Sequence, residues 1–191
     1  MRIRNGTENR RKETAMALRN IRTQGDEILA KTAKPITEIS DRIRDLAADM
    51  LETMYEAEGV GLAGPQVGIL KRIVVIDVTP DRSKPKVMIN PVIVESSGTQ
   101  TGWEGCLSVP GKSGMVTRPD TVKVEYTTLE GKRVQLQATE FFARAVCHEL
   151  DHLDGHLYVE KVEGRLYDNS ELEAMDEDEE DEETREDGIK K

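Results

Sequence analysis

The sequence predicts an α+β fold, and three observations support that prediction. Two segments repeat apolar residues at the three- and four-residue spacing of an amphipathic helix, at residues 35–59 and 141–154. Shorter runs typical of strands lie between them, at residues 72–78, 87–95, 121–129 and 133–139. These helices and strands do not alternate regularly, so a parallel sheet of βαβ units is not expected.

The 191-residue chain is long enough for one domain with its own core, and its charge is concentrated at one end. Residues 170–191 contain twelve Asp or Glu and three Lys or Arg, a net charge of −9 out of −10 for the whole chain. The rest of the chain therefore carries only −1 and shows no broad basic surface. Specific nucleic-acid binding through phosphate contacts is not expected.

Both ends of the chain are predicted to lie outside the folded domain. Residues 1–16 are basic and lack apolar periodicity, so we expect a disordered extension, with Met16 as a candidate for the true first residue. The eight consecutive acidic residues 176–183 repel one another and offer nothing apolar to bury. We therefore expect residues 168–191 to form a disordered acidic tail and the folded domain to span residues 17–167.

The sequence also bears on where the protein resides. No apolar run approaches the 18 residues of a transmembrane helix, and no signal-peptide segment is visible near the N-terminus. Two cysteines, Cys106 and Cys147, do not make a disulfide framework in a chain of this size. These observations favour a cytoplasmic protein without a membrane partner.

The first helix is expected between Pro35, which precedes its start, and Gly59, which suits the position just past its end. We expect this amphipathic helix to pack on a sheet through one apolar face, made of Ile36, Ile39, Ile43, Leu46, Met50 and Met54.

Two strand predictions depend on particular residues. Pro91 cannot donate to a ladder, so the strand over residues 87–95 is expected at a sheet edge or with a bulge. The strands over residues 121–129 and 133–139 are separated by Glu130-Gly131-Lys132 and predict a β-hairpin.

The second helix carries the strongest chemical signal, His148-Glu149-Leu150-Asp151-His152, and Gly155 ends it. Residues four apart lie on one helical face, so His148 and His152 can grip one metal ion together. Glu149 points about 100° away. From there its carboxylate can take a proton from a water at the metal and later pass it to a leaving amine.

A catalytic metal site usually has three protein ligands, so a third is needed. His156 follows the expected helix stop, whereas Cys106 lies in a short apolar, glycine-bearing stretch and offers a soft thiolate for zinc or ferrous iron. Cys106 is the better candidate on these grounds. Cys147 adjoins His148 on a different side of the helix and is expected to pack in the core.

The segment Gly59-Val60-Gly61-Leu62-Ala63-Gly64-Pro65-Gln66 is a glycine-rich loop that does not match a phosphate loop, because no Lys-Ser/Thr follows. Its glycines permit close backbone approach. Gln66 is polar among small and apolar residues, and its amide is suited to donate to a developing oxyanion. The simpler alternative is a tight turn with a surface glutamine.

Taken together, these segments resemble the peptide deformylase family. GVGLAGPQ at residues 59–66, EGCLS at 104–108 and HELDH at 148–152 follow the family's order and spacing, and the resemblance extends from about Ala17 to about Glu163. It implies mostly antiparallel sheets wrapped around a central helix that carries HExxH, with an N-terminal amphipathic helix. It also implies a metal-dependent hydrolase that removes the formyl group from N-terminal formylmethionine and releases formate.

The resemblance assigns roles to particular positions. By their match to the family, Cys106, His148 and His152 are metal ligands, and Glu149 is the general acid/base. Gln66 and the backbone N–H of Leu107 match the donors to the oxyanion.

The remaining matched positions concern the substrate and the support of the site. Val60, Gly61 and Gly105 match substrate-binding positions, where the backbone of the first two pairs with the peptide like an added strand. Glu104 and Arg118 match a buried ion pair behind the cysteine loop.

The cofactor implied by the resemblance is one divalent metal, Fe(II) in cells, with zinc, nickel or cobalt able to substitute. The implied partners are N-formylmethionyl nascent peptides in a bacterial cytoplasm, near the ribosome in passing. Two departures stand out: Gly64 replaces the family's usual alanine, and the acidic tail should be repelled by ribosomal RNA. We therefore expect no ribosome docking through that tail.

Two other functions stay open from the sequence. An HExxH metallopeptidase would complete its site downstream, where His156 and Glu160 are candidates. A catalytically silent relative would only bind formylated or nascent chains, although the presence of Glu149 and Gln66 counts against it.

Overall fold

The computed structural model of this chain describes residues 17–175. The predicted extension at residues 1–16 and the acidic segment 176–191 lie outside the described residues, so the disorder predicted there stays a prediction. Within the described range the predicted α+β class is confirmed, with two long helices and two antiparallel sheets.

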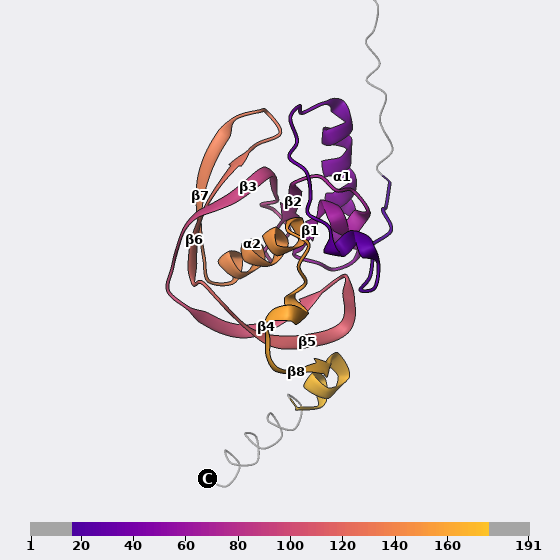
Figure 1. Ribbon diagram of the computed structural model, residues 1–191, viewed down its shortest axis with the longest axis vertical. Coiled ribbons are helices and arrows are strands. Elements are labelled where there is room, and N and C mark those ends of the chain that lie inside the picture. The colour runs from indigo at the N-terminus through magenta and orange to yellow at the C-terminus, as the bar shows by residue number, and fades with distance from the viewer. Residues whose placement is uncertain (1–16, 176–191) are drawn as a thin grey trace, which may run out of the picture.

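The larger sheet has five antiparallel strands in the order β1-β2-β3-β6-β7. Their bounds are β1 (Gly61–Ala63), β2 (Ile73–Ile76), β3 (Lys86–Ser97), β6 (Thr121–Thr127) and β7 (Arg133–Thr139). The predicted hairpin is confirmed, because β6 pairs with β7 from Thr121↔Thr139 to Thr127↔Arg133. Figure 1 shows this sheet curving around the centre of the molecule.

Pro91 lies in β3, which the sequence predicted to be an edge strand or a strand with a bulge. The strand lies in the middle of the sheet, so an edge position is wrong. Its pairing with β6 shifts register between Ile89 and Val92, so the predicted bulge is confirmed and Pro91 sits in the irregular step. The bulge removes the need for a donor at this position.

The smaller sheet was not predicted from the sequence. It has the order β4-β5-β8, with β4 (Gln100–Cys106), β5 (Val109–Arg118) and β8 (Val162–Asp168). β4 and β5 contain four glycines and a proline, which hide the alternation that strand prediction relies on. β4 ends at Cys106, which the sequence predicts to be a metal ligand.

The first helix, α1 (Asp41–Glu56), begins later than the sequence predicted. Ile36 is buried in the same core as the helix, but it lies in extended chain before the N-cap Ser40. The Asn90 side chain accepts from the Ile36 N–H at 2.8 Å and donates to the Ile36 carbonyl at 2.8 Å. These two bonds hold Ile36 in extended chain, so the apolar spacing misplaced the helix start.

The two helices lie on opposite faces of the sheet, and β2 separates them. Val74 and Ile76 belong to the core cluster that includes α2 (Glu140–Leu153), whereas Ile73 and Val75 belong to the cluster that includes α1. Because alternate residues of a strand point to opposite faces, β2 is buried on both sides. Figure 1 shows α2 in the middle of the molecule, with the strands around it and α1 beyond β2.

α2 begins and ends within one residue of its prediction. Gly155 follows it with φ +84°, and a Cβ there would lie 2.7 Å from the carbonyl oxygen of Ala30. Glycine is therefore required both by the left-handed backbone and by the close approach. The turn fixes where the histidine helix stops against the N-terminal segment.

The predicted tail begins within the described residues. β8 extends to Asp168, and residues 169–175 are helical, in the part of the chain where a disordered tail is expected from residue 168. Lys112 pairs with Asp168 at 2.8 Å and the Ser113 hydroxyl donates to Asn169 at 2.9 Å. Side-chain bonds to β5 thus hold a segment that composition alone assigns to the tail.

No helix among residues 17–175 is long and apolar enough to cross a membrane.

Met54 provides a test of this core. It is fully buried between α1 and the sheet, so Met54→Ala should lower the free energy of unfolding by about 2–5 kcal/mol through lost contacts and a cavity. Leu18→Ala, at a side chain 58% exposed, is the matched control and should have almost no effect. Urea denaturation of both variants decides the point, and equal effects at the two positions would contradict this packing.

Candidate metal centre and active site

Three metal-ligating side chains converge where β4 meets α2. One ligand atom from each of Cys106, His148 and His152 lies within 4.8 Å of the other two. Cys106 Sγ is 3.3 Å from His152 Nε2. Cys106 comes from the end of β4 and the histidines from successive turns of α2, so the fold brings together residues about 40 positions apart.

The second nitrogen of His148 is already engaged. Its Nδ1 lies 2.9 Å from Glu104 Oε2, which fixes the ring and leaves Nε2 for the cysteine side of the cluster. Carboxylate support of this kind is common behind metal-bound histidines. His148 also stacks on the buried ring of Tyr158, with centroids 5.8 Å apart. The ring is therefore held by two neighbours before any ion is considered.

The electrostatics of the cluster suit a cation. Burial lowers the pKa of His152 well below its usual value, which favours the neutral imidazole that binds metals. Burial also opposes charge on His148, but hydrogen bonds with Cys106 and Glu104 outweigh it and raise its pKa to about 10. The groups around His148 thus stabilise a positive charge at this position. A thiol and two imidazoles fit zinc or ferrous iron.

Glu149 lies beside this cluster and is buried. Its Oε2 is buried and has no hydrogen-bond partner among the described residues. Burial raises its pKa to about 7, which suits a group that must both accept and donate a proton near neutral pH. A Cβ on Gly61 would lie 2.3 Å from Glu149 Oε1, so the carboxylate rests directly against the backbone of β1.

Gln66 is buried, so the alternative of a surface glutamine is wrong. It lies in the 3-10 helix η2 (Gly64–Val67), and its Oε1 accepts from the Ala63 N–H at 2.8 Å. That bond turns Nε2 toward the cysteine, where it lies 3.5 Å from Cys106 Sγ and donates to Ser108 Oγ at 3.1 Å. The amide is fixed as a donor at the cluster.

Behind the cluster, the predicted ion pair is present as a buried fork. Arg118 Nε donates to Glu104 Oε1 and Nη2 donates to Oε2, each at 2.9 Å. Arg118 Nη1 reaches Asp151 on α2 at 2.6 Å. Burial would raise the pKa of Glu104, but the bonds from Arg118 and His148 lower it to about 2, so the carboxylate is ionised.

A cleft of about 470 Å³ opens over these residues. The sequence-predicted substrate positions Val60, Gly61 and Gly105 line it, as do Leu107 and Glu149. Its walls also include the exposed apolar side chains of Trp103 and Phe141. His152 and Arg118 are not among its lining residues and lie deeper.

Sequence reasoning missed three residues at the site. Ser108 is fully buried and receives the Gln66 amide, and Tyr158, from the 3-10 helix η3 (Tyr158–Lys161), contacts His148. Arg144 donates to Glu104 from one helical turn before His148. Its i,i+4 spacing to His148 on the buried face was the available signal, whereas nothing local to the sequence indicates the contact of Tyr158.

Comparison with known proteins agrees with this geometry. The sequence matches the polypeptide deformylase family over residues 18–166. A peptide deformylase of Agathobacter rectalis is 61% identical over 153 residues, which are 80% of this chain and 95% of that protein. One from Lachnoclostridium phytofermentans is 54% identical over 165 residues, which are 86% of this chain and 99% of that protein.

A solved structure is also similar. The class I type b peptide deformylase of Acinetobacter baumannii with Met-Ala-Ser bound has a TM-score of 0.73 and 39% identity, covering 77% of this chain and 99% of that one. The family match, from residue 18 to residue 166, includes Cys106, His148 and His152 and all of both sheets except the last two residues of β8. This chain therefore belongs to the polypeptide deformylase family.

Proposed function

We propose that this protein removes the formyl group from the N-terminal formylmethionine of newly made peptides in a metal-dependent reaction that releases formate. The observation that carries the proposal is the buried carboxylate of Glu149, whose Oε2 has no hydrogen-bond partner among residues 17–175, beside a Cys-His-His cluster. The similar protein from Acinetobacter baumannii, solved with Met-Ala-Ser bound, supports a methionyl peptide as the substrate class.

The metal would be held by Cys106, His148 and His152. We propose Fe(II) in cells, with zinc, nickel or cobalt able to replace it, because one thiolate and two imidazoles suit all of these ions. When bound, the ion supplies Lewis-acid activation of water and of the formyl oxygen.

Glu149 moves the proton. Its carboxylate accepts a proton as water attacks the formyl carbon, and it then gives that proton to the amine nitrogen when the carbon–nitrogen bond breaks. Formate and a free N-terminal amine are the products. A pKa raised to about 7 by burial matches both halves of this task.

The charge that develops on the formyl oxygen needs donors. Gln66 Nε2 is held toward Cys106 by the bond that its own Oε1 accepts, and the backbone N–H of Leu107 follows Cys106 directly. We assign these two groups to the oxyanion, because preorganised donors in a buried site stabilise such charge strongly. The peptide backbone would lie along Val60, Gly61 and Gly105, which line the cleft.

The cellular setting is part of the proposal. We place the activity on nascent chains in a bacterial cytoplasm, on a catalytic domain spanning residues 17–167. Neither a membrane nor a specific nucleic acid is required. The net charge of −9 on residues 170–191 disfavours docking of that end on ribosomal RNA.

The metallopeptidase alternative has less support. It needs a downstream ligand, but His156 Nδ1 pairs with Glu160 Oε2 at 2.8 Å on the surface, and both side chains are about half exposed. Cys106 instead lies against His152. His156 and Glu160 would have to break this ion pair before either could reach the cluster of Cys106, His148 and His152.

Glu149→Ala tests the proton transfer. Formate release from formyl-Met-Ala-Ser should fall by roughly 10²–10⁴-fold, because general acid–base catalysis is lost while the metal ligands stay in place. Glu38→Ala, at an exposed residue remote from the cleft, is the control and should keep wild-type turnover. Near-wild-type turnover in Glu149→Ala would contradict the assignment.

Cys106→Ser tests the cysteine ligand. Anaerobically purified variant should lose most of its bound metal, since a hydroxyl is a much poorer ligand for these ions than a thiolate. Cys147→Ala, at a buried cysteine in the core, should keep the wild-type metal content. Metal analysis of both samples decides the point, and full occupancy of Cys106→Ser would favour the peptidase alternative.

Gly61→Ala tests the contact between β1 and the carboxylate. The new methyl group would overlap Glu149 Oε1, and the flexible carboxylate has to move because the strand is fixed by pairing with β2. We expect turnover of formyl-Met-Ala-Ser to fall sharply while metal content and the thermal midpoint stay close to wild type. Unchanged turnover would show that Glu149 works from a different position.

A further inference from the structure

Arg144 shares a helical face with the two histidines. It lies four residues before His148 and eight before His152 on α2, so the three side chains follow one line along the helix. Arg144 is only 5% exposed, and arginine is seldom buried this deeply unless its charge is paired. We therefore expect its guanidinium to be paired with groups beside the candidate metal ligands.

The guanidinium group is anchored on both strands of the β4–β5 pair. Nη1 donates to the Val116 carbonyl in β5 at 2.9 Å, and the Gly102 carbonyl in β4, at 3.2 Å, shares one of its two protons. Gly102 and Val116 are partners in the register of the two strands, so one group spans the pair. Since β4 ends at Cys106, Arg144 connects the helix of the histidines to the strand of the cysteine.

The same group completes the surroundings of Glu104. Arg144 Nη1 donates to Oε1 at 2.9 Å, where Arg118 Nε already donates, while Arg118 Nη2 and His148 Nδ1 occupy Oε2. An ionised carboxylate offers about four acceptor positions, so every one is used. With all four occupied the carboxylate has one orientation, and the ring of His148 follows it.

Gly102 leaves the space that this arrangement needs. A Cβ there would lie 3.2 Å from Arg144 Nη2, closer than ordinary van der Waals contact. A methyl group at this position would therefore press on the guanidinium without removing any charge.

We propose that Arg144 is a positioning residue for the metal centre, which fixes the Glu104 carboxylate, and through it the His148 ring, against the strand that carries Cys106. This inference rests on the ligand set given under the proposed function. Arg144 acts through Glu104 and through the two carbonyls. Arg118 keeps Glu104 paired when Arg144 is replaced, so the loss falls on orientation rather than on an uncompensated buried charge.

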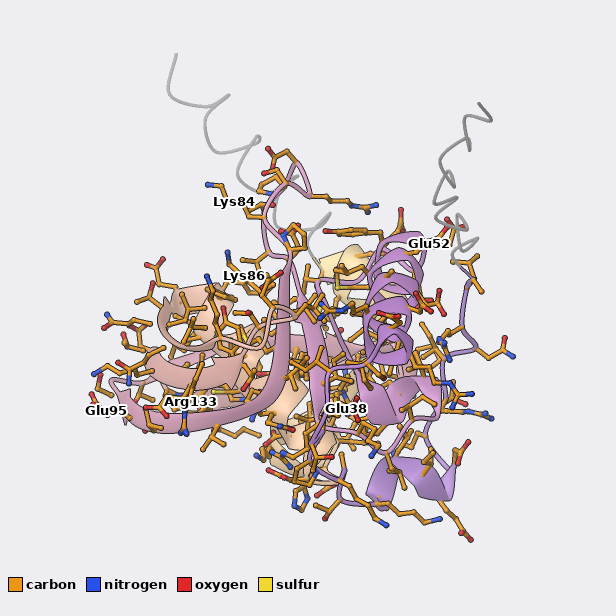
Figure 2. The ribbon with its side chains drawn as sticks, turned by 90° about the horizontal axis from the view of Figure 1, so that it is seen from above. Glu38, Glu52, Lys84, Lys86, Glu95 and Arg133 are labelled. Carbon is orange, nitrogen blue, oxygen red and sulfur yellow. The ribbon has the colours of Figure 1, made fainter. Side chains whose placement is uncertain are left out.

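The test compares Arg144→Met with Arg133→Met. Arg133 pairs with Glu125 on the surface, and Figure 2 shows it with Glu95 at the end of the sheet far from α1. Co(II) is added to the metal-free proteins, and its dissociation constant is measured by competition with a chelator. The thiolate-to-cobalt absorption band is recorded on the same samples. We expect Arg144→Met to bind Co(II) about 10–100-fold more weakly with an altered band, and Arg133→Met to match wild type.

Kinetics on the metal-saturated proteins provide a second readout. In Arg144→Met, kcat for formyl-Met-Ala-Ser should fall by a larger factor than KM rises, because Arg144 lines the cleft but its guanidinium is bonded to Glu104 and the two carbonyls. Arg144→Lys should recover part of the Co(II) affinity, since one ammonium reaches Glu104 but cannot also span both carbonyls. Gly102→Ala should weaken Co(II) binding in the same direction as Arg144→Met.

Wild-type Co(II) affinity and an unaltered band in folded Arg144→Met would overturn the proposal. If that variant fails to fold, Arg144→Lys and Gly102→Ala decide it by the same two measurements, and wild-type values in both would overturn it. A wild-type protein that binds Co(II) but releases no formate would defeat the proposed function alone. The effect of Arg144 on Co(II) affinity would still be measurable in that case.

Discussion

The Glu104 carboxylate joins the two parts of the molecule on which the candidate centre depends. It accepts hydrogen bonds from Arg118 on β5 and from Arg144 and His148 on α2, and it lies two residues before Cys106 on β4. A buried charge is tolerated only when it is paired and its hydrogen bonds are satisfied, so each of these partners constrains the others. This one carboxylate therefore links the helix that carries the histidines to the strand that carries the cysteine.

Glu104 and Glu149 show how burial can give two carboxylates opposite properties. Donors surround Glu104 and lower its pKa to about 2, whereas burial raises the pKa of Glu149, whose Oε2 has no donor among residues 17–175, to about 7. Titratable pairs pushed apart in this way mark a division of roles at many active sites. Here the first carboxylate orients a ring, and the second is the one we propose to exchange a proton. Gly61 contributes by leaving room for the second one at the edge of β1.

The sequence was informative where chemistry and periodicity are local. The histidine helix, the hairpin of β6 and β7 and the bulge at Pro91 all follow from patterns within one segment. The start of α1 did not, because a distant residue, Asn90, occupies the backbone groups of Ile36. β4, β5 and β8 were not predicted, because glycines interrupt the alternation of apolar and polar residues and because the strands pair with partners distant in the sequence. The contacts of Arg144 and Tyr158 likewise exist only once α2, η3 and the small sheet are assembled.

The central claim is that Cys106, His148 and His152 together hold one ion. X-ray absorption at the zinc edge of the zinc-loaded protein tests it directly, because sulfur and nitrogen ligands scatter at different distances. We predict one sulfur at about 2.3 Å and two imidazole nitrogens at about 2.0–2.1 Å, with any remaining ligand a light atom. A spectrum with no sulfur, or with a single imidazole, would contradict it.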